Sequence, residues 1–167
     1  MDKNIKRDGG KANGFRHVLW QSMITERFGE NISIQAGDSH ERYIRAKDLE
    51  KIISNENYVY NSLDDADEIT DQLNNKIGRN IAKNSPGLSP KELSAVILDY
   101  YKNEGIFEVK KEKNIFKVFK NKLPSDIHQE AKERLKTLDN NGAGKRIRAA
   151  RKKIEESYDS MQMLKGW

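Results

Sequence analysis

Two of the three histidines in this chain stand in short polar patches of its first half. His17 belongs to Asn13-Gly-Phe-Arg16-His17-Val-Leu-Trp20, and His40 belongs to Gly37-Asp38-Ser-His40-Glu41. A third patch, Asp71-Gln-Leu-Asn74-Asn75-Lys-Ile-Gly78-Arg79, carries a carboxylate, two amides and an arginine. Neutral imidazole binds metal ions or accepts protons, and carboxylates do either as well. The three patches therefore predict a polar site between helices.

The first patch places its polar side chains at helical spacing. Asn13 and His17 are four residues apart, and His17 and Trp20 are three apart, so the three share one helix face. The charge of Arg16 opposes protonation of the neighbouring imidazole, which favours a neutral His17. The alternative is a half-buried His17 that simply packs on Trp20.

The second patch ends in two adjacent groups that cannot both aim squarely at one point unless they sit at its rim. Side chains of consecutive helical residues diverge by about 100°. We therefore expect that either His40 or Glu41 faces the site while the other orients a neighbouring group. Gly37, three residues before His40, would allow a second helix or a ligand to approach closely. The alternative is an ordinary exposed His-Glu pair.

The third patch forms a polar stripe beside an apolar one. Asp71, Asn74, Asn75 and Gly78 stand at positions i, i+3, i+4 and i+7, next to an apolar stripe of Ile69, Leu73 and Ile77. Aspartate and asparagine are poor helix formers, and such a conflict with local propensity is typical of functional positions. A helix lining a polar cleft has this pattern, although a solvated polar face shows it too.

The rest of the chain predicts a mostly α fold with a small two-stranded β-hairpin near residues 106–119. Strand-like runs flank Lys113-Asn114, and Ser89-Pro90-Lys-Glu92 has the pattern of a capping box. We expect Asn13 to cap the first helix. The expected parts are a lead-in (1–12), a helical domain with the site (13–104), and a basic hairpin with a helical extension (105–167). The expected helices cover 15–28, 32–43, about 62–84, 89–101, 125–138 and 145–158.

Composition limits the possible classes of protein. The chain has 167 residues, no cysteine, and no apolar run near the ~20 residues that span a bilayer. The polar segment Met1–Gly10 does not resemble a signal peptide, so if the protein leaves the cell we expect a specialised route: it would be secreted or delivered into a target cell as part of a larger protein. Residues 1–100 carry a net charge of −2 and residues 101–167 carry +7. The basic half suits nucleic acid, an anionic membrane or an acidic protein partner.

Over about residues 9–85, the three patches resemble a bacterial domain family of uncharacterised function. That family often forms the C-terminal module of polymorphic toxins and of large cell-surface or secreted repeat proteins. Its motifs are Asn-x-x-Arg-His-x-x-Trp, an Asp-Ala-His-Glu-like segment and Asn-Asn-x-x-Gly-Arg, and Ser39 stands here where alanine is common. The resemblance implies a toxin or effector module, for which a cognate immunity protein is the expected partner.

We therefore expect an antibacterial effector hydrolase that acts on an anionic phosphodiester or phospholipid. The expected catalytic residues are His17, His40, Glu41 and Asp71, and a Zn²⁺ or Mn²⁺ ion, if bound, would be held by His17, His40 and Asp71. Without a metal, a His-Glu pair could provide acid–base catalysis. The expected substrate-binding residues are Arg16, Trp20, Asn74, Asn75 and Arg79.

Two alternatives remain open. A toxin that targets nucleic acid, such as a nuclease, would grip phosphates through basic residues of the second half: Lys110, Lys111, Lys113, Lys117, Arg146, Arg148, Arg151 and Lys152. A non-enzymatic binding module would instead use the polar stripe as a buried hydrogen-bond network that fixes helix packing.

Overall fold

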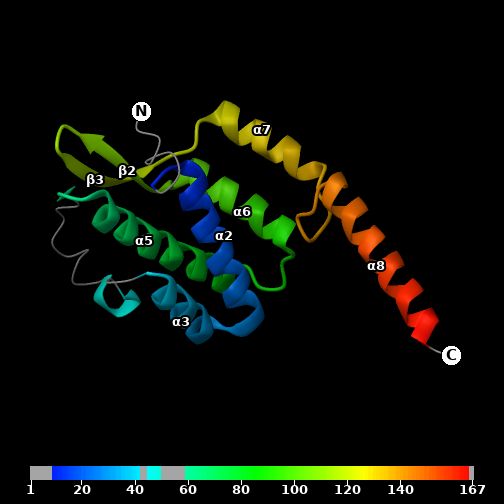
Figure 1. Ribbon diagram of the computed structural model, residues 1–167. Helices are drawn as coiled ribbons and strands as arrows, with labels where there is room; N and C mark the ends of the chain where they lie inside the picture. The colour runs from blue at the N-terminus through cyan, green and yellow to red at the C-terminus, as the bar shows by residue number, and fades with distance from the viewer. Residues whose placement is uncertain (1–8, 42–44, 50–58, 166–167) are drawn as a thin grey trace.

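The computed structural model describes residues 9–41, 45–49 and 59–165 and confirms a mostly α fold (Figure 1). Parts of the expected second helix and of the segment that follows it lie outside the described residues. The elements in chain order are α2 (Lys11–Phe28), α3 (Glu30–His40), the short 3-10 helix η1 (Ala46–Asp48), β1 (Val59–Tyr60), α5 (Leu63–Asn84), α6 (Pro90–Asn103), β2 (Ile106–Glu112), β3 (Ile115–Asn121), α7 (Ser125–Lys136) and α8 (Lys145–Lys165).

Helix α5 is the centre of the fold. Ser62 is its N-cap, and the Ser62 hydroxyl accepts a hydrogen bond from the Asp65 N–H at 3.1 Å. Acidic residues fill the first turn, where the helix dipole favours negative charge. Its apolar stripe is buried. One end of the stripe packs with α2 and α6 around Ile77, and the other end packs under the sheet around Leu73.

Helix α2 crosses α5 at very short range because Gly78 has no side chain. A Cβ atom at Gly78 would lie 2.3 Å from the carbonyl oxygen of Val18 in α2. Because the two helices lie so close there, the Ser22 hydroxyl can donate a hydrogen bond to the Gly78 carbonyl at 2.9 Å. The glycine of the third patch is therefore a packing residue that brings the polar faces of α2 and α5 together.

The expected hairpin is present and gains a third strand. β2 and β3 pair antiparallel from Ile106↔Asn121 to Glu112↔Ile115, and β1 pairs with β3 in the sheet order β1-β3-β2. The exposed edge of β2 is protected by groups from elsewhere in the chain: the Asn74 amide binds the Phe107 backbone, and the Val109 N–H donates to the Gly9 carbonyl at 2.9 Å.

Several helix boundaries differ from the expected ones. α2 begins at Lys11 with Gly10 as its N-cap, so the prediction that Asn13 caps this helix was wrong, and Asn13 is buried inside it. The capping box of Ser89 and Glu92 is confirmed at the start of α6. α8 runs seven residues beyond the expected end at Tyr158.

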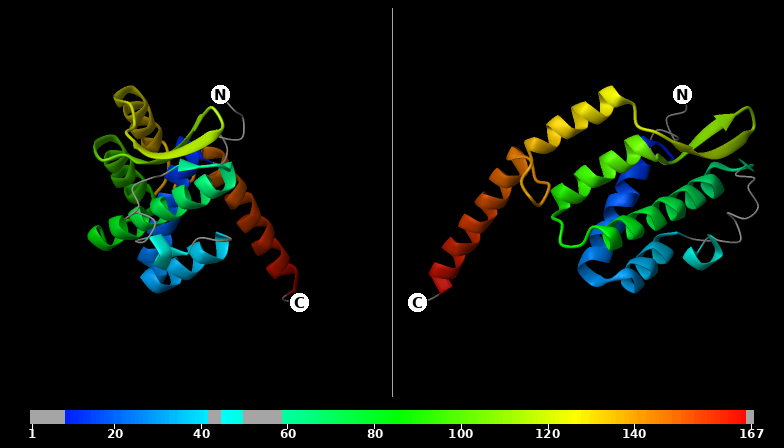
Figure 2. Two further views of the ribbon diagram at one scale, coloured as in Figure 1. Left: turned by 90° about the vertical axis from the view of Figure 1, so that its left-hand side faces the viewer. Right: turned by 180° about the vertical axis from the view of Figure 1, so that it is seen from behind.

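α7 runs from beside the hairpin along α6, and α8 lies at the other end of the molecule from the hairpin (Figure 2). α7 is held on α6 by Asp99, which accepts from His128 at 2.7 Å and from Lys132 at 2.8 Å. This contact leaves the His128 side chain only 13% exposed. α8 then extends away from the body. Among the described residues, no helix is long and apolar enough to cross a membrane.

Candidate active site

His17 is a buried imidazole of α2 that bridges two side chains of α5. Its Nδ1 lies 3.1 Å from Asn75 Oδ1, and its Nε2 lies 3.1 Å from Asp71 Oδ2. An amide oxygen only accepts hydrogen bonds, so Nδ1 carries the proton that it donates to Asn75. Burial lowers the pKa of His17 to about 4, and the charges of His40 and Arg16 oppose protonation as well. His17 is thus neutral near pH 7, as the sequence predicted.

Asp71 complements this neutral imidazole. Burial, with Asp67 and Glu41 nearby, raises the pKa of the Asp71 carboxyl to about 9. The protonated carboxyl can then donate from Oδ2 to Nε2 of His17, while Oδ1 accepts from Asn13 Nδ2 at 2.9 Å. Burial disfavours the imidazolium form of His17 and the carboxylate form of Asp71. Nε2 of His17 and Oδ2 of Asp71 therefore share one proton, and the pair has no net charge.

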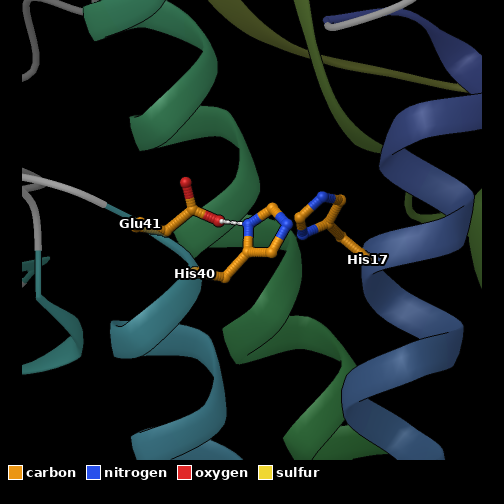
Figure 3. A group of neighbouring side chains, drawn as sticks. All are labelled: His17, His40 and Glu41. Atoms are coloured by element: carbon orange, nitrogen blue, oxygen red, sulfur yellow. Dashed lines mark hydrogen bonds and ion pairs between the residues drawn. The ribbon is translucent and has the colours of Figure 1, made fainter.

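His40 is the last residue of α3 and Glu41 follows it directly, and both lie close to His17. The His40 Nδ1–H donates to Glu41 Oε1 at 3.0 Å, which leaves Nε2 of His40 with a free lone pair in the neutral ring. The Glu41 side chain is buried, and burial raises its pKa although the bond from His40 lowers it. Figure 3 shows the rings of His17 and His40 pointing toward one another from α2 and α3.

Two neighbours of His40 fix the end of α3. A Cβ atom on Gly37 would lie 3.0 Å from Gln21 Nε2 and 3.2 Å from Asn75 Nδ2, so the glycine lets α3 approach α2 and α5 closely. Asp38 Oδ1 accepts from the Ala46 N–H at 2.7 Å and from Gln72 Nε2 at 3.1 Å. Asp38 thereby ties both α3 and the segment beyond Glu41 to α5.

A pocket of about 290 Å³ opens beside these groups. It is lined by Arg16, His17, Trp20 and His40. The ring of Trp20 stands edge-on to both imidazoles, with centroid distances of 6.2 Å to His17 and 5.7 Å to His40. Arg16 is exposed at this pocket and donates to Asn13 Oδ1. The pocket thus combines an exposed cation, an aromatic face and two imidazoles.

Within the described part of the chain, His17, His40 and Glu41 form a group that could hold a metal ion. One nitrogen or carboxylate oxygen from each residue lies within 4.8 Å of the others. Two imidazoles and a carboxylate are a ligand set typical of catalytic zinc. The expected set had Asp71 as the third ligand. In the structure Glu41 takes that place, and Asp71 instead bonds to His17.

Three expected substrate-binding residues, Asn74, Asn75 and Arg79, do not line the pocket. Asn74 is fully buried, and its amide exchanges hydrogen bonds of 2.9 and 3.0 Å with the backbone of Phe107. Arg79 is also buried, and its NH1 donates to Gln21 Oε1 at 3.2 Å. Burial lowers the pKa of Arg79, whereas a residue that binds exposed anions would be open to solvent. Asn75 lies beneath the pocket as the partner of His17.

Gln21 is a central residue that the sequence reasoning missed. Its side chain is fully buried, and its Oε1 accepts from Ser33 in α3 and from Arg79 in α5. It therefore joins the three helices that supply the site. The available signal was its position four residues after His17, because an i+4 residue lies on the same helix face.

The basic residues expected to bind nucleic acid come from two separate elements, the hairpin and α8. The lysines of the hairpin and the arginines of α8 lie at opposite ends of the molecule (Figures 1 and 2). Several are engaged locally: Lys110 and Lys117 pair with Glu112, and Lys152 lies 3.7 Å from Glu156. A continuous phosphate-binding track does not follow from this placement.

Fold and site together define a mostly helical protein with a histidine–carboxylate group between α2, α3 and α5. The family model described as a domain of unknown function, DUF6973, matches residues 2–105, which is more than half of the chain. The chain belongs to this family. Comparisons with curated proteins and with solved structures return no match. The matched range contains α2, α3 and α5, the three helices that supply the site.

Proposed function

We propose that this chain is a hydrolase of an anionic phosphoester, with a catalytic group formed by His17, His40 and Glu41 around a divalent cation. The observation that carries the proposal is the meeting of these three residues within 4.8 Å beside a pocket that also exposes Arg16 and Trp20. They come from α2 and from the end of α3, which are brought together by the glycine-mediated approach of the helices.

The contacts of His17 fit such a cation. Asn75 Nδ2 has no hydrogen-bond partner among the described residues, so the His17 contact alone orients that amide. A cation that replaces Asn75 at Nδ1 would leave Nε2–H to donate to the Asp71 carboxylate. Metal-binding histidines commonly donate their second N–H to a carboxylate in this way. Asp71 is then a positioning residue. Zn²⁺ and Mn²⁺ both suit ligands of this type and would activate water for attack.

The remaining residues around the pocket can orient the substrate. Arg16, exposed at the rim, would neutralise a phosphate oxygen. Trp20 would pack on the apolar part of the substrate next to the ester. The Glu41–His40 pair could also transfer protons, since the carboxylate orients the imidazole and leaves Nε2 open toward the pocket.

Elemental analysis of protein purified without chelator tests the metal. We expect close to one ion per chain in the wild type and in His128→Ala, the matched control at the remaining histidine, which pairs with Asp99 between α7 and α6. We expect loss of the ion in His17→Ala and His40→Ala. A wild type that binds neither Zn²⁺ nor Mn²⁺ in calorimetric titration would remove the metal from the proposal.

Hydrolysis tests the reaction. A chromogenic phosphodiester, single-stranded nucleic acid and phospholipid vesicles distinguish the two substrate classes that the sequence analysis leaves open. His17→Ala and His40→Ala should abolish turnover with whichever substrate is cleaved, and His128→Ala should retain it. If both site variants hydrolyse as fast as wild type, the site is wrong, whatever the metal content.

We further propose an antibacterial effector role, with delivery as part of a larger protein and an immunity protein as partner. The motif resemblance alone supports this setting. Expression of the wild type in a bacterial cytoplasm should stop growth, and His40→Ala, whose side chain is largely exposed, should remain folded and harmless. Growth that is unaffected by active wild-type enzyme would contradict the toxin role without touching the hydrolase.

A non-enzymatic binding module is the second candidate. It is favoured by Asn74, Gln21 and Arg79, whose buried hydrogen bonds join helices and sheet instead of facing a ligand. Stable, metal-free protein without activity on any of the three substrates would support this candidate over the hydrolase.

A further inference from the structure

Helix α8 carries an apolar face that is largely exposed to solvent. The helix extends away from the body (Figures 1 and 2), and every side chain described in it, residues 145–158, is exposed. Ile147, Ile154 and Tyr158 are 52%, 69% and 58% exposed. At 100° per residue these three lie within about 60° of one another around the helix, together with Arg151.

The length of α8 calls for a packing partner. It spans 21 residues, about 30 Å, and much of its sequence is charged. Helices in proteins owe most of their stability to the packing of an apolar face against something else. Here that face has the spacing of a core-facing helix but meets solvent in the single chain.

One residue of this face, Arg151, lines a groove between α8 and the body. A pocket of about 360 Å³ lies between α8, the end of α2 and the start of α6, and Arg151, from the same face as Ile154, is one of its walls. Met23, Leu88 and Pro90 are among the other residues that line it. The groove has room for apolar side chains of a helix laid along α8.

The distribution of charge along α8 indicates which partner would pack on its apolar face. Residues 145–153 hold six Lys/Arg and no acid, whereas Glu155, Glu156 and Asp159 follow directly. Two parallel copies of α8 would place the two basic segments side by side. Two antiparallel copies centred on Ile154 would set Lys152 and Lys153 of one against Glu156 and Glu155 of the other, so the same surface is complementary to itself.

We propose that two copies of this chain associate through antiparallel pairing of α8 about Ile154, each inserting apolar side chains beside the groove of the other. An anionic membrane is the competing occupant of a basic amphipathic helix. It fits less well because acidic residues occupy the second half of the helix.

Solution mass measured by light scattering across a concentration series tests the pairing. We expect twice 19.3 kDa for the full chain, with dissociation promoted by salt. Ile154→Asp should raise the dissociation constant by about tenfold or more, because the pairing would bury a charge. Ala149→Asp makes the same charge change on the opposite helix face and should leave the dimer intact. A monomer at all concentrations, or a monomer that binds anionic vesicles, overturns the proposal.

Disulfide trapping tests the direction, since the chain has no cysteine of its own. Ile154→Cys lies at the proposed centre and should form a disulfide-linked dimer under mild oxidation. Ile147→Cys should not, because antiparallel copies separate the two positions by about 21 Å along the helix axis, far beyond disulfide reach. Trapping at both positions would show parallel helices, and trapping at neither would show that α8 does not pair; each result overturns the proposal.

Discussion

Replacing Asn74 with alanine should destabilise the fold and leave the pocket chemistry in place. The side-chain amide of Asn74 acts as a short strand: it donates to the Phe107 carbonyl at 3.0 Å and accepts from the Phe107 N–H at 2.9 Å. These two bonds dock β2, and with it the hairpin, on α5. The side chain is fully buried, so truncation removes both bonds and opens a small gap.

The expected loss follows from those two bonds. Each hydrogen bond that a buried backbone group loses costs about 1–3 kcal/mol. Alanine returns about half a kcal/mol through its higher helix propensity. Part of the Phe107 backbone can be rehydrated because its residue is only half-buried. The free energy of unfolding should therefore fall by about 2–4 kcal/mol.

Urea denaturation followed by circular dichroism measures this loss. Asn80→Ala is the matched control, because Asn80 is exposed on the same helix and its replacement should change stability by less than about 0.5 kcal/mol. Metal binding per folded Asn74→Ala molecule should equal that of wild type. If Asn74→Ala is as stable as Asn80→Ala but loses ligand or metal binding, Asn74 serves the site and the structural interpretation is wrong.

Three further predictions concern single residues. Asp71→Asn should be more stable than metal-free wild type. A carboxyl whose pKa rises from 3.8 to about 9 contributes stability that is full below pH 3.8 and is lost as the pH rises through 9. An amide does not ionise, so the variant escapes that loss. Urea titrations between these two pKa values should show a gap that widens with pH, and a constant gap would indicate an ionised Asp71. Gly78→Ala should lower stability by about 1–3 kcal/mol or more, because its Cβ would lie 2.3 Å from the Val18 carbonyl oxygen; an unchanged melting temperature would contradict the close helix crossing. Ser89→Ala should cost about 1 kcal/mol in chemical denaturation through loss of the capping box, and no cost would mean that the cap is dispensable.

Local signals predicted most of the fold. The apolar repeat of α5, the capping box of α6 and the turn at Lys113-Asn114 each act over a few residues, and each appears in the structure where the sequence places it. β1 was missed because a two-residue strand has no period of its own and exists only through pairing with β3. Asn13 was misread because a residue suited to capping can also serve inside a helix when a distant carboxyl accepts its amide.

The polar stripe of α5 shows that spacing predicts a shared helix face but not the partner of each residue on it. Asp71, Asn74, Asn75 and Gly78 share one face, but that face meets two different neighbours. Asp71 and Asn75 meet His17 of α2, Asn74 meets the backbone of β2, and Gly78 meets the backbone of α2. Phe107 is 33 residues from Asn74, and nothing in the intervening sequence marks it as a partner. The helix period defines the face, while tertiary packing assigns each residue on it.

The different partners of neighbouring residues on α5 also link the site to the sheet. Asn74 and Asn75 are adjacent on a rigid helix, one holding β2 and the other holding His17. Gln21 and Arg79 secure the other side of the same crossing, and Asp38 anchors the helix that supplies His40. The imidazoles are therefore positioned by hydrogen bonds whose removal acts first on helix packing. A variant of Gln21 or Arg79 that loses activity together with stability reports on the scaffold, whereas loss of activity at constant stability, as expected for exposed His40, reports on the chemistry.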